Sequence, residues 1–392
     1  MITLQGKRNS ATVFAEKIDK ETKKRICDLL SDEAFSDSKI RIMPDAHASK
    51  SAVVGTAMTL QGRVRPSLLG PDIGCGMEVV FLSDTGADLE KLDRIIHENI
   101  PCGKNIRENA SACFDFSELI CKDKIDADRA EKSLGTLGGG NHFIELDRSE
   151  SGSLLLLIHS GSRSLGSGVA EYYEHEAFRE MCKKERKKAK CAYYEERGEG
   201  GFERTSRKGK STVKIVRENA VLSGKLFEQY LHDIKVVQAF AEKNRRLMAE
   251  IICREMGFTA ESRFSCVHNY IDTEHMILRK GAISARQGEK IIVPLNMRDG
   301  AVIGTGLGNP EWNFSAPHGA GRACPRHEAK KAFTVEEYRE QMEGIYTTTA
   351  QEGSLDECPM AYKSPEKILP FLAETAEIEQ TVKPVYNFKA CE

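Results

Sequence analysis

The sequence lacks the features that mark membrane proteins, secreted proteins and zinc ribbons. Its apolar runs are shorter than the roughly 20 residues that span a bilayer. Its N-terminus has no charged segment followed by an apolar one, as a signal peptide would. Although there are 12 cysteines, none lies in a Cys-x-x-Cys pair, which argues against a zinc ribbon or a thioredoxin-like site. These absences predict a cytoplasmic protein without a membrane partner, whose cysteines are mostly reduced thiols.

Aromatic residues are also scarce, at 7% of the chain with a single tryptophan, Trp312. Hydrophobic residues make up 40% and charged residues 30%, which is typical of a soluble globular protein with a real core. The net charge of −2 provides no overall attraction for nucleic acid, so RNA binding would require a local basic groove.

Short apolar segments alternate with amphipathic ones along the chain. Residues 11–15, 40–43, 77–82, 154–158 and 382–388 have the pattern of strands, and 277–306 that of strands joined by glycine turns. Residues 21–30, 89–100, 169–190 and 221–256 have the pattern of helices, and 333–372 is helical again. Because polar, glycine-rich motifs end several of these segments, we expect one α+β domain over residues 1–392 with a single composite site.

One stretch differs in composition from the rest. Residues 183–190 form a basic run, and residues 195–214 mix glycine, serine and charged residues. Such a composition buries too little apolar surface to order itself against a core. We expect residues 183–214 to be a charged surface insertion, of which residues 195–214 are mobile. The basic run is interpreted as a solvated helix face, with contact to RNA phosphate as the alternative.

A lone histidine, His318, is followed by Gly319, Ala320 and Gly321 and then by Arg322. Small residues let backbone and ligand approach an imidazole closely. An unhindered imidazole can attack a phosphoryl group while a guanidinium holds its oxygens. The alternative is a glycine turn with an incidental histidine.

A carboxylate and a thiol, Asp72 and Cys75, lie three residues apart among glycines. Both could contact one cation from a tight turn, and a soft thiolate beside a hard carboxylate suits a transition metal such as Mn, Fe, Co or Zn. A glycine turn with a buried thiol is the alternative interpretation.

Three further histidines stand at predicted strand ends beside glycine, serine or asparagine. His142 follows three glycines and Asn141, His159 leaves an apolar run into a Ser-Gly-Ser loop, and His268 precedes Asn269. Each alone could be a satisfied core residue. With Asp72 and Cys75 they make five candidate ligands, enough for two cations that share one ligand.

Taken together, these blocks resemble the RtcB family of RNA ligases. The similarity runs from Met43-Pro-Asp-Ala-His47 to the near-terminal Lys389, with the Asp-Ile-x-Cys-Gly, Gly-Asn-His-Phe, His-Ser-Gly-Ser-Arg, His-Asn-Tyr and His-Gly-Ala-Gly-Arg blocks in the family's order. The resemblance implies mixed sheets with helices outside and a central metal and nucleotide cleft. It also implies ligation of an RNA 3′-phosphate or 2′,3′-cyclic phosphate to a 5′-hydroxyl, using GTP and Mn²⁺ at two sites.

The resemblance also implies a role for each matching residue. His318 would attack the α-phosphate of GTP and carry GMP, which passes to the RNA 3′-phosphate before the 5′-hydroxyl displaces it. Cys75 would bridge two metals, with Asp72 and His142 at one and His159 and His268 at the other. The remaining implied contacts are Asn141 and Asn269 to GTP phosphates, Gly319 and Gly321 beside the nucleotide, Tyr362 and Lys389 to guanine, and Arg163 and Arg322 to RNA or nucleotide phosphates.

Some blocks depart from the family's pattern. Ala48, Ser49 and Lys50 replace a glycine-containing loop, residues 294–300 replace a Pro-Gly-Ser-Met-Gly block, and Gly74 stands where asparagine is common. We interpret the chain as a divergent branch that repairs cleaved RNA, for which an archease-type activator would be a further partner. Two alternatives remain: a metal-dependent phosphohydrolase that acts without a covalent adduct, and a non-catalytic protein that binds RNA ends.

Overall fold

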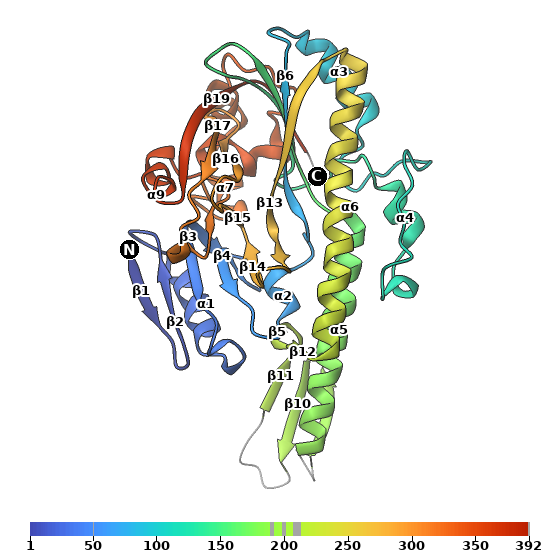
Figure 1. Cartoon of the computed structure of the whole chain (residues 1–392), viewed down its shortest axis with the longest axis vertical. Helices are drawn as coiled ribbons and strands as arrows, with labels where there is room; N and C mark the ends of the chain where they lie inside the picture. Colours follow the sequence, from blue (N-terminus) through green and yellow to red (C-terminus); the bar gives the residue numbers. More distant parts are fainter. Residues whose placement is uncertain (50, 189–191, 198–200, 207–212, 391–392) are drawn as a thin grey trace.

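The fold is described from a computed structural model, which covers residues 1–49, 51–188, 192–197, 201–206 and 213–390 (Figure 1). One mixed sheet of 12 strands forms its centre, in which only β2 and β3 pair in parallel. In spatial order the strands are β1 (Ile2–Gln5), β2 (Ser10–Val13), β3 (Ile40–Ala48), β4 (Val53–Thr59), β14 (Ile277–Lys280), β13 (Ala260–Asp272), β6 (Cys75–Leu82), β8 (Leu154–Ser160), β7 (Phe143–Arg148), β19 (Ala376–Lys389), β17 (Gly300–Gly306) and β16 (Lys290–Asn296). The predicted α+β class with a mixed sheet is confirmed.

The middle strands of this sheet are buried on both faces. In β6, Met77 and Val79 join one apolar cluster while Val80 and Leu82 join another on the opposite face. Every residue of β8 is buried, as the unbroken run of apolar residues in this strand predicts. The site described below is built at the ends of these well-supported strands.

Two long helices, α5 (Arg163–Lys188) and α6 (Lys225–Met256), lie side by side along one flank of the sheet (Figure 1). Helix α6 packs on β6, β8 and β13, and α3 (Leu89–Asn99) packs on α6. The fully buried Arg245 of α6 donates from Nη1 to the carbonyls of Gly74 (2.7 Å) and Ser160 (3.0 Å). The helix therefore holds the start of β6 and the end of β8 next to each other.

Smaller elements complete the fold. Helix α1 (Lys20–Leu30) is capped by the Asp19 carboxylate and packs on β3. Two short sheets pair β5 (Arg63–Val64) with β12 (Leu222–Ser223) and β15 (Ala282–Ser284) with β18 (Ser315–Pro317). The other helices include α2 (Pro66–Leu69), α4 (Ala127–Lys132), α7 (Arg326–Ala332), α8 (Val335–Gln341), α9 (Leu369–Leu372) and the 3₁₀ turns η4 (Pro310–Trp312), η5 (Glu352–Glu357), η6 (Pro359–Ala361) and η7 (Pro365–Lys367).

Several predicted elements differ from the structure in their bounds or in their type. Strand β3 does not end at Pro44 but runs to Ala48, because an irregularity in its pairing with β4 accommodates the missing N–H of proline. Helix α5 begins at Arg163, six residues before the predicted start, although its first turn contains serine and glycine. The tail 333–372 is not mainly α-helical, since short α-helices alternate there with 3₁₀ turns.

The expected irregular insertion also differs from the structure. Strands β9 (Ala192–Arg197), β10 (Gly201–Ser206) and β11 (Val213–Val216) pair as an antiparallel sheet of their own. The labelled β10 and β11 lie at the level of the lower part of α5, below the large sheet (Figure 1). Residues 189–191, 198–200 and 207–212 of the predicted insertion lie outside the described residues. Among the described helices, none has the length and apolar composition needed to cross a membrane.

Candidate active site

Neighbouring strands bring three of the predicted metal ligands together. Cys75 opens β6, His159 lies near the end of β8, and His268 belongs to β13. The Cys75 Sγ lies 3.3 Å from His159 Nε2, which lies 2.9 Å from His268 Nε2. One ligand atom from each of the three buried residues falls within 4.8 Å of the others. This group, the Cys75–His159–His268 cluster, has the composition of a transition-metal site.

His142, just before β7, borders the same thiol, with Nε2 3.5 Å from Cys75 Sγ. The Nδ1 atoms of His142 and His159 face the carbonyls of Leu137 (2.7 Å) and Asn141 (3.1 Å). Because a carbonyl only accepts, each Nδ1 must carry the proton, which leaves the Nε2 lone pair directed at the cluster. Carbonyls that orient histidine ligands in this way are common around protein-bound metals.

Burial sets the protonation of these groups. It lowers the pKa of His142 to about 4 and moves the pKa values of His159 and His268 well below the ordinary range, so the imidazoles are neutral ligands. Burial, reinforced by the nearby Asp72, raises the pKa of the Cys75 thiol to about 12. A cation would have to displace the thiol proton, so its binding would release a proton.

Asp72 stands at the rim of the cluster, where its side chain is exposed. The turn from Asp72 to Cys75 is fixed by Asn269, whose amide donates to the carbonyls of Asp72 (2.6 Å) and Leu69 (3.2 Å). The Asn269 Oδ1 is buried and has no hydrogen-bond partner among the described residues. Asn269 thus supports the turn that presents the carboxylate and the thiol.

His318 follows β18 and faces the cluster. Its ring centroid lies 4.8 Å from that of His268, and its Nδ1 lies 2.6 Å from Oδ2 of Asp45. The same oxygen accepts the backbone N–H of His318 at 3.2 Å. Asp45 is fully buried, whereas 17% of the His318 side chain is exposed. With Nδ1 donating to this carboxylate, Nε2 is the atom available for chemistry.

The glycines after His318 are needed for this approach. Gly321 has φ +70, and a Cβ there would lie 2.3 Å from the Asp45 carbonyl oxygen. A Cβ on Gly319 would lie 3.1 Å from the carbonyl of Pro294. A side chain at position 321 would therefore displace the strand that carries Asp45.

A cavity of about 960 Å³ opens in front of His318. It also borders Pro294 and Asn296, which belong to the block that departs from the family pattern. The predicted site residues on its wall are Asp72, Cys75, Asn141, His159, His268, Asn269, His318, Gly319, Gly321, Arg322, Tyr362 and Lys389. His142 and Arg163 instead line a smaller cavity of about 230 Å³, which also borders Asp72. The two cavities thus flank the Cys75–His159–His268 cluster.

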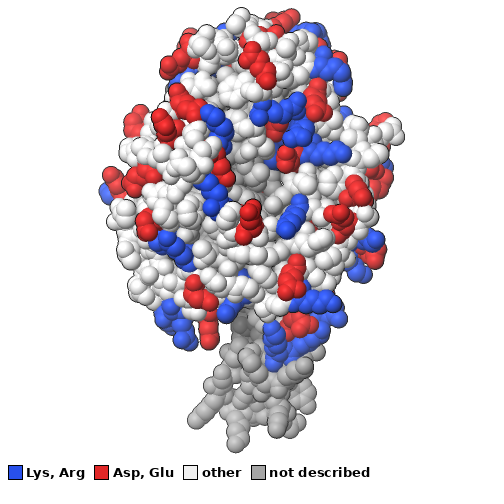
Figure 2. Space-filling model, viewed as in Figure 1, with Lys and Arg blue, Asp and Glu red and all other residues white. Residues whose placement is uncertain are grey.

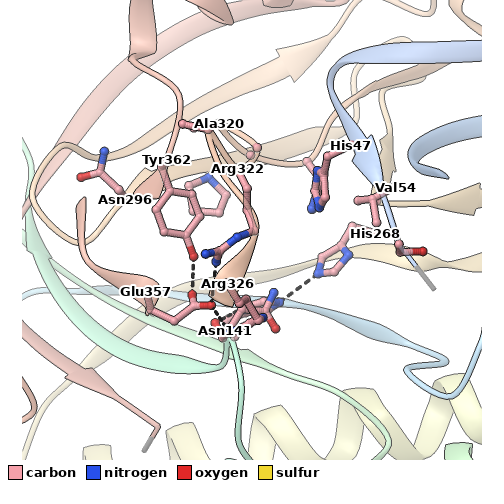
Figure 3. A pocket seen from close by; sticks show the side chains of 18 of the residues that line it. His47, Val54, Asn141, His268, Asn296, Ala320, Arg322, Arg326, Glu357 and Tyr362 are labelled. Carbon is pink, nitrogen blue, oxygen red and sulfur yellow. Dashed lines mark hydrogen bonds and ion pairs between the residues drawn. The ribbon is translucent and has the colours of Figure 1, made fainter. Parts of the chain in front are cut away.

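The Glu357 carboxylate contacts several basic side chains on one side of the large cavity. Its carboxylate lies 3.0 Å from both Arg322 Nη1 and Lys389 Nζ, and it also contacts Arg326 and accepts from the Tyr362 hydroxyl. Figure 3 shows Tyr362, Arg322 and Arg326 converging on this carboxylate, with His47 and His268 on the other side of the cavity. The buried Glu357 carboxylate thus fixes the positions of Arg322, Tyr362 and Lys389, which the sequence predicts to contact the nucleotide.

Sequence reasoning missed three residues of this site. Asp45 lies in the Met43-Pro-Asp-Ala-His47 block, so its position in that motif was the available signal. Glu357 and Arg326 lie in segments without a recognisable motif. Only the folded chain shows that they meet Arg322, Tyr362 and Lys389.

Replacing Glu357 with glutamine is expected to destabilise the fold by roughly 3–5 kcal/mol at pH 7, because the largely buried Arg322 and Lys389 lose their counter-charge. Burial acts to raise the pKa of this carboxyl, but Lys389, Arg326 and Arg322 lower it to about 2, below its ordinary value of 4.5. The unfolded chain therefore binds the proton more tightly, and the stabilisation is complete above pH 4.5 and lost as the pH falls towards 2. Urea unfolding of both proteins at several pH values measures the difference in their free energies of unfolding.

Glu352→Gln is the matched control, because Glu352 opens the same 3₁₀ turn but is exposed. It should change stability by less than roughly 0.5 kcal/mol. If the Glu357→Gln protein is as stable as this control at pH 7, the ion pairs of Glu357 with the basic side chains around it do not stabilise the fold.

The comparisons with known proteins agree on one family for the chain. A family model described as "tRNA-splicing ligase RtcB" matches residues 33–124 and 109–390. The chain is 30% identical to the RNA-splicing ligase RtcB of Escherichia coli strain K12, over 91% of both chains. It is 26% identical to RNA-splicing ligase RtcB2 of Escherichia coli strain ATCC 25922, over 83% of this chain and 81% of that one. It is 24% identical to the tRNA-splicing ligase RtcB of Aeropyrum pernix, over 83% and 82%.

Proposed function

Because the chain belongs to the RtcB family of RNA ligases, we propose that it seals RNA 3′-phosphate or 2′,3′-cyclic phosphate ends to 5′-hydroxyl ends through a GMP adduct on His318. One observation carries the proposal. The available Nε2 of His318 belongs to a ring held by Asp45 and centred 4.8 Å from the ring of His268 in the Cys75–His159–His268 cluster. A nucleophile and a cation site therefore face the same cavity.

In the first step the Nε2 lone pair of His318 would attack the α-phosphorus of GTP. An N–P bond forms, the bond to the β-phosphate oxygen breaks, and pyrophosphate leaves. Positive charge develops on the imidazole, and the buried Asp45 carboxylate accepts from Nδ1 and stabilises it. An RNA 3′-phosphate oxygen would then take GMP from His318, and the 5′-hydroxyl would displace GMP as the strands join. A 2′,3′-cyclic phosphate would first be hydrolysed to the 3′-phosphate.

The donor set fits two divalent cations, Mn²⁺ in this proposal. Cys75 would bridge them, because its Sγ lies 3.5 Å from His142 Nε2 and 3.3 Å from His159 Nε2. Asp72 and His142 would complete one site, and His159 and His268 the other. Bound cations would neutralise phosphate charge and lower the pKa of the 5′-hydroxyl.

The nucleotide would occupy the cavity of about 960 Å³ beside His318, which would then be the predicted central cleft. Gly319 and Gly321 leave room for its phosphates, and Asn141 and Arg322 are nearby donors. Tyr362 and Lys389 would hold the guanine. The buried Glu145 also lines this cavity, and its carboxylate could accept the guanine N1–H and N2–H. Asn269, which uses its amide on two carbonyls, is assigned to supporting the Asp72 turn instead of a phosphate.

RNA would reach the cations through the smaller cavity. Arg163, Lys104 and Arg129 line it beside Asp72 and His142, a grouping suited to phosphate oxygens. Basic and acidic side chains are mixed over the face of the molecule in Figure 2. The attraction for RNA would therefore come from such local groups and not from the surface as a whole.

The proposal is tested by incubating the protein with Mn²⁺ and GTP labelled at the α-phosphate, then adding RNA with 3′-phosphate and 5′-hydroxyl ends. A labelled protein band followed by strand joining is the expected result. Phosphate release from a cyclic end without any adduct would indicate the phosphohydrolase, which the names of the relatives do not favour. Binding of the RNA end with neither reaction would indicate a non-catalytic protein.

Asp45→Asn is expected to slow adduct formation by roughly 10²–10⁴-fold, because a neutral amide stabilises the developing imidazolium far less than a carboxylate does. Mn²⁺ binding should be retained, since Asp45 contacts His318 and not the cluster. Single-turnover labelling with GTP measures the rate. Asp37→Asn, at an exposed carboxylate, is the control, and equal rates for the two variants would exclude the role given to Asp45.

Four wider expectations accompany the proposal. Residues 1–392 would act as one catalytic unit, because the site draws on residues from Asp45 to Lys389. A role in RNA repair, help from an archease-type activator and a cytoplasmic location stay predictions.

A further inference from the structure

The turn that precedes His318 has an unusual backbone. Asn313 and Phe314 both have positive φ values, 52° and 53°, although neither is glycine. They lie between η4 and β18, and His318 follows β18 directly. Such a conformation persists only where the surroundings hold it. Whatever holds this turn also determines where the His318 imidazole lies.

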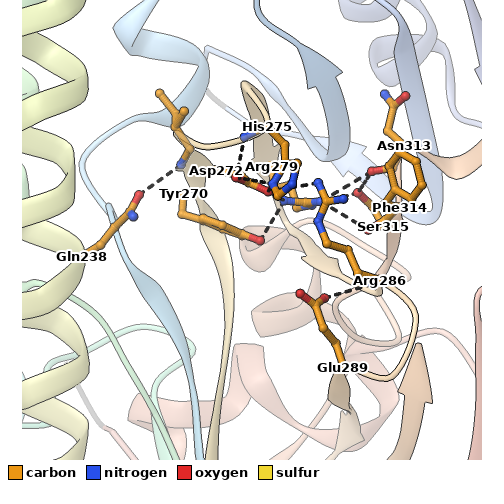
Figure 4. Close-up of polar contacts among 11 residues, drawn as sticks. Gln238, Tyr270, Asp272, His275, Arg279, Arg286, Glu289, Asn313, Phe314 and Ser315 are labelled. Carbon is orange, nitrogen blue, oxygen red and sulfur yellow. Dashed lines mark hydrogen bonds and ion pairs between the residues drawn. The ribbon is translucent and has the colours of Figure 1, made fainter. Parts of the chain in front are cut away.

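A single buried guanidinium supplies much of that support. Arg279 of β14 is fully buried, and its Nε donates to Ser315 Oγ at 2.8 Å. Its Nη2 donates to the Phe314 carbonyl at 3.2 Å, and its Nη1 to the Tyr270 hydroxyl at 2.8 Å. Asp272 lies 3.4 Å away as a counter-charge. Figure 4 shows Arg279 at the centre of these contacts.

The other side of the turn is held by different groups. The Asn313 amide donates to the carbonyls of Lys39 (2.9 Å) and Ala57 (3.0 Å), which belong to the β3–β4 side of the sheet. Trp312, just before the turn, stacks on Phe14 with ring centroids 3.5 Å apart. Arg279 therefore holds the side of the turn that lies against β13 and β14.

Arg279 also joins the turn to the strands that carry those ligands. It pairs with Tyr270 across the β13–β14 ladder, two residues beyond His268. Two residues after Arg279, Gly281 approaches the His318 ring so closely that a Cβ there would lie 3.1 Å from His318 Cε1. A shift of the turn relative to β14 would thus change the distance between His318 and His268.

We propose that Arg279 is a positioning residue: its guanidinium fixes the Asn313–Phe314 turn against β13 and β14 and so aligns His318 for attack on the nucleotide. The inference rests on the proposed function. Arginine is required because its planar fork reaches Ser315, Phe314 and Tyr270 in different directions at once. A lysine ammonium in the same space keeps the charge but cannot form that pattern.

The test separates the step that uses His318 from one that does not. Arg279→Lys is expected to slow formation of the labelled GMP adduct by roughly 10²-fold, the effect of a small misplacement of a reacting group. An RNA that already carries GMP on its 3′-phosphate does not need His318. The rate at which the variant seals this RNA should stay within about 3-fold of the wild-type rate, because the substitution disturbs only the alignment of His318. The absorption of Co²⁺ bound to the cysteine thiolate, which reports the cation site, should be unchanged.

Ser315→Ala provides a second variant if Arg279→Lys does not fold. It removes one partner of the guanidinium and should slow adduct formation by roughly 5- to 10-fold, again sparing the sealing step. Arg263→Lys, on β13 with a partly exposed side chain, is the matched control and should behave as wild type.

Two outcomes overturn the inference: adduct formation at the wild-type rate in a folded variant, or equal loss of both steps, which would mark Arg279 as general support. Absence of the adduct in the wild-type protein would instead reject the proposed function. The two failures are therefore distinguishable.

Discussion

His318→Ala is expected to abolish the labelled GMP adduct, lowering its rate of formation by roughly 10⁴-fold or more, because the attacking lone pair is removed. The Cys75–His159–His268 cluster does not depend on this ring for its contacts, so Mn²⁺ should still bind. Strand joining from GTP should be lost to the same extent, because both later steps need the transferred GMP. Gel analysis of labelled protein and joined RNA measures both.

His175→Ala is the control, because this histidine lies on α5 with 62% of its side chain exposed. It should form the adduct at the wild-type rate. If His318→Ala still forms an acid-labile protein–GMP bond, another residue is the nucleophile and the assignment is wrong. If the adduct is lost but RNA carrying GMP on its 3′-phosphate is still sealed, His318 acts in the transfer steps alone, as proposed.

The grouping of Cys75, His159 and His268 could be predicted from the sequence, because each of these residues belongs to a local sequence pattern. Cys75, His159 and His268 each lie at or beside an apolar strand, in small-residue or amide-rich surroundings. The antiparallel pairing of β13, β6 and β8 then aligns them, with Cys75 opposite Asn269 and His159 opposite Met77. Residue type and position within a strand were sufficient to predict that these three side chains meet.

The partners of His318 and Arg322 could not be found in that way. Asp45 and His318 are 273 residues apart in the chain, and nothing in either segment encodes their contact. Glu357 lies in a 3₁₀ turn whose sequence predicts no buried acid, and its environment exists only after Arg326 and Lys389 have packed around it. Such contacts depend on tertiary packing, which local sequence patterns do not report.

One departure from the family pattern has a clear physical reason in the fold. Gly74 has φ +77, and a Cβ there would lie 2.8 Å from the Cβ of Ala241 on α6. Helix α6 thus packs against the turn that presents Cys75, and Arg245 of the same helix donates to the Gly74 carbonyl. Any larger residue at position 74 would push α6 away from that turn, so glycine is required in this chain.

Cys75→Ser is expected to have the second large effect, weakening Mn²⁺ binding by at least about 100-fold and stopping adduct formation. Even residues that only orient metal ligands cost 10- to 100-fold when replaced, and the Cys75 Sγ lies within 3.5 Å of Nε2 of both His142 and His159. A serine hydroxyl keeps the shape but releases its proton less readily than a thiol. Metal content after dialysis and the Mn²⁺-dependent rise in melting temperature measure the loss.

Cys121→Ser controls for the substitution itself, because Cys121 is a buried core cysteine near Asp233 and away from the cluster residues. It should bind Mn²⁺ and form the adduct normally, with at most a small loss of stability. Wild-type Mn²⁺ affinity in Cys75→Ser would mean that the histidines alone hold the cation, and that the thiol is a packed core residue. Lost affinity with an unchanged fold would instead link the thiolate, the cations and the guanylylation of His318 in one site, because a nucleophile facing a triphosphate needs its charge neutralised before it can attack.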